Sequence, residues 1–224
     1  MTEKIRVEKK LLSENNRRAG VIRRKLAEHK ILCLNFVSSP GSGKTSLLEK
    51  TLASLGGRIS MALIAGDVQT DNDARRLSRA GGPIVHAVTT GGACHLDAAM
   101  IGTVLDKLDP AAIDLLIIEN VGNLVCPAGF DLGEDMKVVL ISTAEGDDKP
   151  LKYPAMFRRA SVMVINKIDL LGLSDFETDR ARENALLINR GLTIFDISCR
   201  TGAGLENWYA WLEEQIKLKK SSRP

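Results

Sequence analysis

The chain has 224 residues, a formal charge of +3, ordinary apolar content and few aromatic residues, which suits one α/β domain with a full core. No apolar run approaches the length needed to cross a bilayer, and no signal-like stretch follows the charged N-terminus, so we expect a cytoplasmic protein with no membrane partner. Its four irregularly spaced cysteines do not suggest a disulfide framework.

The opening segment, residues 1–30, holds ten Lys/Arg against four Asp/Glu, a balance of +6, whereas the remainder carries −3. Apolar residues recur here near helical spacing, which predicts an amphipathic helix that lies on the domain or on a partner. These residues are Leu11, Leu12, Ala19, Ile22 and Leu26. Because no aromatic residues interleave with the arginines, a solvated helical face explains them better than a nucleic-acid site, and we expect no nucleic-acid partner.

Seven short apolar runs alternate with helical segments beyond residue 30, and several are apolar throughout, as central parallel strands are. The runs are 31–37, 59–65, 84–88, 115–119, 138–142, 162–166 and 193–197. We predict a three-layer α/β fold with a mainly parallel sheet of about seven strands and helices on both faces. The domain would span residues 31–216, and residues 217–224 would form a frayed tail.

The segment 38–46 directly follows the first run and is typical of a phosphate-binding loop. Its glycines let backbone N–H groups face a phosphate, and the next helix adds its positive end. Lys44 would reach the β and γ oxygens, and Thr45 would ligate Mg²⁺. Ser38 replaces the usual first glycine, which matters little where φ is negative. The predicted phosphate-binding residues, which make the fold a P-loop NTPase, are Pro40, Gly41, Ser42, Gly43, Lys44, Thr45 and Ser46.

Acidic residues follow two later runs, at the sheet edge where ligands of such folds gather. Asp67 would join the Mg²⁺ shell. Asp71 or Asp73 could orient the attacking water, although Asp73 could instead cap a helix predicted over 74–80. Glu119 could hold a water of the Mg²⁺ shell, and the N–H of Gly122 could bond the γ-phosphate. The candidate catalytic residues are therefore Lys44, Asp67, Asp73, Glu119 and Gly122.

The segment Asn166-Lys167-Ile168-Asp169 follows the sixth run and indicates which nucleotide base the site would bind. Guanine offers N1–H and N2–H₂ donors that the Asp169 carboxylate could accept together, whereas adenine offers no such pair. Asn166 would brace neighbouring loops or bond the base, and the stem of Lys167 would cover the purine face. After the last run, a backbone N–H of Ser198 or Cys199 could meet guanine O6. We therefore expect GTP rather than ATP.

A separate group of candidate ligands is Cys94, His95 and Cys126, whose thiolate and imidazole groups suit Zn²⁺ or Ni²⁺. We place Cys94 and His95 at the start of a helix, where adjacent side chains point about 100° apart. Cys94 and His95 could then bind the same ion only if the backbone there is irregular, or if the site is shared by two copies of the chain across a two-fold axis. Alternatively, Cys94 packs, His95 caps the helix and Cys126 lies in a loop. Cys33 would be a small core residue.

The chain resembles the HypB family of nickel-incorporating GTPases for hydrogenase maturation, over most of residues 31–212. The matching segments are 39–45, 66–70 with 73–74, 92–97, 118–127, 145–154 and 166–169. The resemblance implies a slow GTPase that converts GTP to GDP, forms a homodimer with nucleotide, and binds nickel or zinc at the dimer interface through Cys94, His95 and Cys126. It also implies two partners, a hydrogenase large-subunit precursor and a small zinc-containing accessory chaperone, which the opening helix could contact. Residues 1–30 lack the cysteine motif or histidine-rich tract of some relatives, so we expect no storage role.

Because Cys126 follows Gly122 so closely, we expect GTP to assemble both dimer and metal site, and hydrolysis to loosen them. Three rival functions remain. A nickel GTPase serving urease would carry a Cys-x-His pattern, whereas Cys94 and His95 are adjacent. A small-molecule kinase has no reason to carry residues 166–169. A metal-binding adaptor with incidental hydrolysis stays open, because turnover depends on sub-ångström water placement.

Overall fold

Seven parallel strands form one sheet in the computed structural model, which describes residues 3–80 and 84–222, with the backbone alone for residues 3–9. They are β1 (Leu32–Ser38), β2 (Met61–Asp67), β3 (Ile84–Thr89), β4 (Leu115–Glu119), β5 (Met136–Ser142), β6 (Val162–Asn166) and β7 (Thr193–Asp196). Their order is β3-β2-β4-β1-β5-β6-β7, and every neighbouring pair is parallel. The predicted α/β fold and its strands are confirmed.

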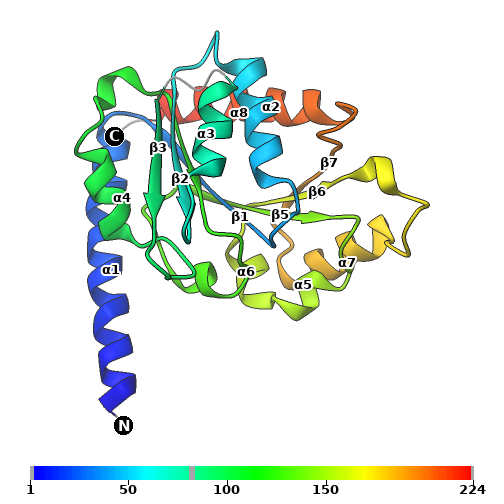
Figure 1. Ribbon diagram of the computed structural model, residues 1–224, viewed down its shortest axis with the longest axis horizontal. Coiled ribbons are helices and arrows are strands. Elements are labelled where there is room, and N and C mark those ends of the chain that lie inside the picture. Colours follow the sequence, from blue (N-terminus) through cyan, green and yellow to red (C-terminus); the bar gives the residue numbers. More distant parts are fainter. Residues whose placement is uncertain (1–2, 81–83, 223–224) are drawn as a thin grey trace.

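Helices cover both faces of this sheet (Figure 1). One face carries α2 (Lys44–Leu55), α3 (Asn72–Arg79) and α8 (Leu205–Ser221); the other carries α1 (Glu3–Glu28), α4 (Ala98–Leu105), α6 (Pro154–Arg159) and α7 (Thr178–Ile188). Shorter helical turns are α5 (Lys149–Lys152), η1 (Pro110–Ala112), η2 (Cys126–Gly129) and η3 (Ile168–Leu170). Within the described ranges, no helix is both long and apolar enough to traverse a bilayer.

Alternation along β1 explains how one strand serves both layers. Leu34 and Phe36 belong to the core beneath α2 and α8, whereas Cys33 belongs to the core beneath α1 and α4. Cys33 is fully buried, as predicted for a small core residue. Burial raises the pKa of its thiol well above the ordinary value, so the thiol stays protonated at neutral pH.

The N-terminal helix α1 packs on the sheet through its C-terminal half. Ala19, Ile22 and Leu26 are buried, as predicted, but Leu11 is 63% exposed and Leu12 is also exposed. The domain does not cover these two leucines because the helix outruns the sheet: its 26 residues span about 39 Å, whereas a strand of seven residues spans about 23 Å. Contact of this part of the helix with a partner, the other predicted setting, stays a prediction. The N-terminal end of α1 therefore extends past the body of the domain (Figure 1).

The C-terminal helix α8 continues to Ser221, so the frayed tail predicted from residue 217 is wrong up to that point. Ile216 is buried, Lys219 Nζ lies 2.5 Å from Asp135 Oδ1, and Lys220 Nζ lies 2.7 Å from Asp114 Oδ1. These ion pairs attach the last turns of α8 to the residues that precede β4 and β5. Residues 223–224 lie outside the described residues.

Candidate functional site

The loop between β1 and α2 has the backbone of a phosphate cradle. Gly41 and Gly43 have φ of 76° and 96°, a region that side chains with a Cβ disfavour. Gly43 also has no room for a side chain, because a Cβ there would lie 2.2 Å from Asn166 Nδ2. Ser38 is the last residue of β1 and keeps its extended backbone. The serine at the first motif position is therefore compatible with the loop.

Three buried side chains meet beneath this loop. Lys44 Nζ lies 3.1 Å from Glu119 Oε1, and Thr45 Oγ1 donates a hydrogen bond of 2.7 Å to the same oxygen. The other carboxylate oxygen of Glu119, Oε2, is buried and has no hydrogen-bond partner among the described residues. A buried carboxylate oxygen that lacks a partner suits a cation or its bound water. The donor set therefore fits the hard oxygen chemistry of Mg²⁺.

Two acidic residues, Asp67 at the end of β2 and Asp73 in α3, have different surroundings. Asp67 Oδ1 accepts the N–H groups of Gln69 and Thr70, both at 2.8 Å, and mainly the Thr70 bond holds the pKa of Asp67 below its usual range. Asp67 is thus ionised at neutral pH, and these bonds do not use its Oδ2. Asp73 lies in the first turn of α3, one residue inside the helix, which begins at Asn72 rather than at the predicted position 74.

Two adjoining cavities lie over the loop. The first, of about 690 Å³, is lined by Gly41, Lys44, Thr45, Asp67, Asp73 and Gly122, among others. The second, of about 400 Å³, is lined by Asn166, Asp169, Leu170, Cys199 and Arg200, and the two share Gly43, Ser46 and Lys167. A nucleotide lying across the shared residues would place its phosphates in the first cavity and its base in the second.

The base-side residues are held by hydrogen bonds to the phosphate loop. Asn166 Nδ2 donates to Ser42 O at 2.9 Å, and Lys167 Nζ donates to Gly41 O at 2.7 Å. Asn166 therefore braces neighbouring loops, one of its two predicted roles. Its Oδ1 accepts the N–H of Cys199 at 3.2 Å. This bond occupies the Cys199 N–H, and the Ser198 N–H donates to Ala203 O at 2.9 Å, so both N–H groups that could meet guanine O6 are engaged within the protein.

Asp169 lines the base cavity and is held by its neighbours. Its Oδ1 accepts a hydrogen bond from the Ser198 hydroxyl, and its side chain is 13% exposed. Arg200 lies 3.8 Å from Oδ2, but its own side chain is 82% exposed. The carboxylate therefore lines the cavity as a largely desolvated acceptor pair.

Sequence reasoning missed three charged residues that line the phosphate cavity or contact the phosphate loop. Arg76 lines it and pairs with Glu49 at 2.8 Å and with Asp73 at 3.6 Å. From the segment after β5, Glu145 Oε1 accepts the Ser42 hydroxyl at 2.7 Å, and Lys149 Nζ donates to Ser39 Oγ at 3.1 Å. Arg76 follows Asp73 by nearly one helical turn, a spacing that could have revealed it. For the other two, no local pattern in the sequence points to the phosphate loop.

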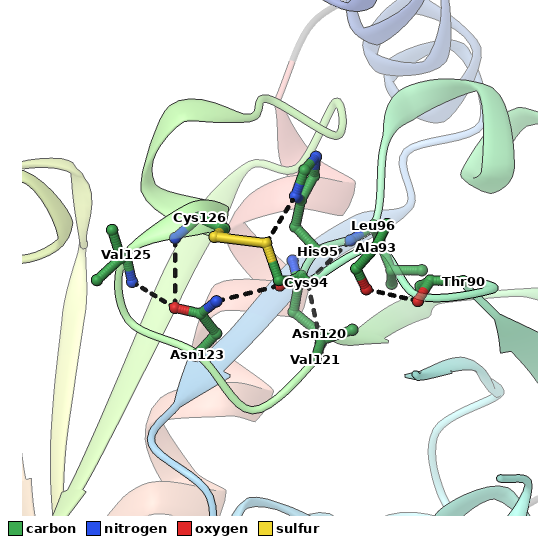
Figure 2. The surroundings of a disulfide bond; sticks show 10 residues. All are labelled: Thr90, Ala93, Cys94, His95, Leu96, Asn120, Val121, Asn123, Val125 and Cys126. Atoms are coloured by element: carbon green, nitrogen blue, oxygen red, sulfur yellow. Dashed lines mark hydrogen bonds between the residues drawn. A yellow bond between two sulfur atoms is a disulfide. The ribbon is translucent and has the colours of Figure 1, made fainter. Parts of the chain in front are cut away.

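The predicted metal ligands do meet. Ligand atoms of Cys94, His95 and Cys126 lie within 4.8 Å of one another, and Cys94 and Cys126 form a disulfide (Figure 2). The disulfide contradicts our expectation from the irregular cysteine spacing, because the fold brings the two Cα atoms to 6.2 Å, within disulfide range. Cys94 and His95 also precede α4, which begins at Ala98 after its cap, Asp97, and are not at its start.

This irregular backbone removes the predicted obstacle to joint binding, since Cys94 Sγ and His95 Nδ1 are 3.6 Å apart. The His95 ring lies against that of Phe130, with centroids 3.7 Å apart, and burial lowers the pKa of His95. A neutral imidazole can ligate a metal. Reduction of the disulfide would supply the two thiolates, the form in which cysteine binds metal.

Two asparagines that follow β4 hold the backbone around this cluster (Figure 2). Asn120, next to Glu119, accepts the Leu96 N–H through Oδ1 at 3.2 Å and donates to Asn35 Oδ1 at 3.2 Å. Asn123 donates to Cys94 O at 3.4 Å and accepts the Cys126 N–H at 3.3 Å. Glu119, the last residue of β4, thus contacts the phosphate loop, and the next residue, Asn120, contacts the segment that carries Cys94 and His95.

A phosphate cradle, a buried acid and an adjoining base cavity on a parallel sheet define a P-loop nucleotide-binding protein, here with a Cys-His-Cys cluster beside the nucleotide site. A family model for the CobW/HypB/UreG nucleotide-binding domain matches residues 33–196. The chain therefore belongs to the CobW/HypB/UreG family.

Relatives of known name support this assignment. The hydrogenase maturation factor HypB of Rhizobium leguminosarum bv. viciae is 52% identical over 93% of this chain and 70% of that protein; HypB of Escherichia coli K12 is 48% identical over 94% and 72%. The hydrogenase/urease maturation factor HypB of Helicobacter pylori J99 is 41% identical over 94% and 88%. Among solved structures, HypB from Helicobacter pylori in complex with nickel has a TM-score of 0.86 at 39% identity, covering 94% of this chain and 99% of that one.

Proposed function

We propose that this chain is a GTPase that carries nickel to a hydrogenase precursor, with nucleotide controlling the metal site. One observation carries the proposal: the end of β4 holds both sites. Glu119 contacts Lys44 and Thr45, and the adjacent Asn120 holds the loop that bears Cys94 and His95. A shift of β4 on nucleotide binding would move both. The HypB names of the relatives supply the client class.

In the nucleotide site, the loop N–H groups and Lys44 would hold the phosphates, and Asp169 would select guanine. Thr45, Glu119 and Asp67 would hold Mg²⁺, which when bound neutralises charge on the β and γ oxygens. Gly122 lines the phosphate cavity, and a Cβ on it would lie 3.3 Å from Pro40 Cγ. This close approach to the phosphate loop supports a role for the Gly122 N–H in sensing the γ-phosphate.

Our candidate for the group that positions the attacking water is Asp73. Asp73 lines the cavity but pairs with Arg76, which also pairs with Glu49. Asp73 would need to leave this ion pair, or share it, to orient a water. This arrangement accords with slow turnover, and it leaves open the alternative of a metal-binding adaptor in which hydrolysis is incidental.

The metal site would take Ni²⁺ as cargo, or Zn²⁺, through reduced Cys94 and Cys126 with His95. Three ligands leave room for another from water or a second copy, and we propose a GTP-dependent homodimer that brings two such clusters together. Val125, beside Cys126, is 63% exposed and would be covered by such a contact. We further propose that the protein uses GTP, lies in the cytoplasm and works with a small zinc-containing accessory chaperone. A urease is the alternative client.

The domain division is also proposed: residues 31–216 as the GTPase unit and residues 1–30 as an N-terminal helical segment.

The deciding experiment compares wild type with Cys94→Ala, both reduced, with GDP or a non-hydrolysable GTP analogue. We expect Ni²⁺ affinity to differ between the nucleotides in wild type, dimer content to rise with the analogue, and Cys94→Ala to lose Ni²⁺ binding while it hydrolyses GTP. Equal Ni²⁺ affinity with both nucleotides would contradict nucleotide control. Absence of turnover in wild type, with Ni²⁺ binding retained, would favour the adaptor.

A further inference from the structure

The middle of α1 carries a buried polar side chain, Asn15, which is 7% exposed. Its Nδ2 donates to Asp131 O at 2.8 Å, and its Oδ1 accepts the N–H of Ala98 at 2.9 Å. Ala98 begins α4, and the first N–H groups of a helix have no partner within it. Asn15 therefore supplies the acceptor for the Ala98 N–H that α4 itself lacks. Both the oxygen and the NH₂ group of its side-chain amide form hydrogen bonds.

The two partners of Asn15 belong to the two segments that bear the metal ligands. Ala98 lies three residues after His95, and Asp131 lies five residues after Cys126. These segments come from opposite sides of β4 in the sequence. One side chain from α1 thus bonds the backbone of both segments that carry the metal ligands.

Other contacts keep α1 against the same segments. Arg23 Nη2 lies 2.6 Å from Asp131 Oδ1. Gly133, with φ of 85°, lies so close to α1 that a Cβ on it would be 2.6 Å from Ile22 Cγ2. Lys25 pairs with Asp106, at the end of α4, at 3.1 Å. The C-terminal half of α1 is thereby docked on both segments, while Leu11 further up the helix is exposed.

We propose that Asn15 is a positioning residue for the metal cluster: it sets the distance between the Cys94–His95 loop and the Cys126 loop, and so couples the placement of α1 to metal affinity. This inference rests on the proposed metal role of the three ligands. Removing the amide would let the two loops separate. Both the closure of the Cys94–Cys126 disulfide and the joint binding of a metal would then become less favourable.

The test compares Asn15→Ala with Asn16→Ala, a matched change at the neighbouring exposed position of the same helix. The first measurement needs no metal: each protein is equilibrated with glutathione redox buffers, and the fraction of Cys94–Cys126 disulfide is measured. We expect Asn15→Ala to lower the effective concentration of the two thiols about fivefold, which corresponds to about 1 kcal/mol, and Asn16→Ala to leave it unchanged.

The second measurement titrates the reduced proteins with Co²⁺ and follows the thiolate-to-cobalt absorption band. Affinity should fall about fivefold in Asn15→Ala, with GTP affinity unchanged. If Asn15→Ala does not fold, Asn15→Asp decides, because it keeps the acceptor for the Ala98 N–H and loses the donor to Asp131. Disulfide equilibrium and Co²⁺ affinity equal to wild type would overturn the proposal. A wild-type protein without a thiolate–cobalt band would instead overturn the metal function, and the disulfide equilibrium would still decide the role of Asn15.

Discussion

Replacement of Asp169 by asparagine is a direct test of the base cavity. The Ser198 hydroxyl donates to Asp169 Oδ1 and would hold the asparagine oxygen in that place. The amide NH₂ then takes the place of Oδ2 and faces the N2–H₂ group of guanine, so that two donors oppose each other. Because the side chain is 13% exposed, water offers little compensation.

The expected loss follows from the bonds removed. The bond to N2–H₂ is lost and the bond to N1–H loses its charged acceptor. Hydrogen bonds to a charged group contribute about 1.5–3 kcal/mol each, so the two changes together should cost about 3 kcal/mol, or roughly a 150-fold weaker GTP affinity. Xanthosine triphosphate carries a carbonyl at C2, which the new amide can bond, so its affinity should rise relative to that of GTP.

Calorimetric titration of wild type and Asp169→Asn with both nucleotides measures this change. Ser198→Ala is the control, because it keeps the carboxylate and removes only the hydroxyl that orients it; we expect a smaller loss and no preference for xanthosine triphosphate. If Asp169→Asn prefers GTP over xanthosine triphosphate by the same factor as wild type, the assignment of this cavity to guanine is refuted.

Two further changes test the loop and the thiols. Gly43→Ala should lower the free energy of unfolding by about 1–2 kcal/mol and abolish detectable nucleotide binding. The reason is that φ is 96° and the new Cβ would lie 2.2 Å from Asn166 Nδ2. Urea unfolding measures the stability, and nucleotide titration measures the binding. In the reduced protein at pH 8, iodoacetamide should label Cys94 and Cys126 before Cys199. Burial raises the pKa of the Cys199 thiol to about 11, so at this pH roughly one Cys199 thiol in a thousand is the reactive thiolate. Peptide mass spectrometry gives the order, and earlier labelling of Cys199 would contradict the reasoning.

Gly41→Ala is the matched control for the glycine substitution. Its φ of 76° is also positive, but a Cβ there meets nothing within 4 Å among the described residues. It should therefore show the backbone strain without the collision. Equal effects of the two substitutions would mean that contact with the Asn166 side chain is not what requires glycine in the loop.

The sequence by itself determined the elements whose signals are local. A buried parallel strand is apolar throughout, so the runs 31–37 and 115–119 could be recognised one at a time. A phosphate loop is also continuous in the chain, since one turn and one helix end bind the ligand. Because parallel strands end at one edge of the sheet, the order of strands and polar residues along the chain was enough to assign the candidate nucleotide ligands to that edge.

Only the tertiary structure decided which distant residues meet. Cys94 and Cys126 are separated by 32 positions, and neither spacing nor helical periodicity predicts that their Cα atoms lie 6.2 Å apart. Equally, nothing near residue 217 predicts that Lys219 finds Asp135, and so the end of α8 was expected to fray. Leu11 satisfies the apolar period of α1, yet no sheet lies beneath it. Local patterns report the conformation that the backbone prefers, whereas burial and long-range pairing depend on what the rest of the chain places alongside.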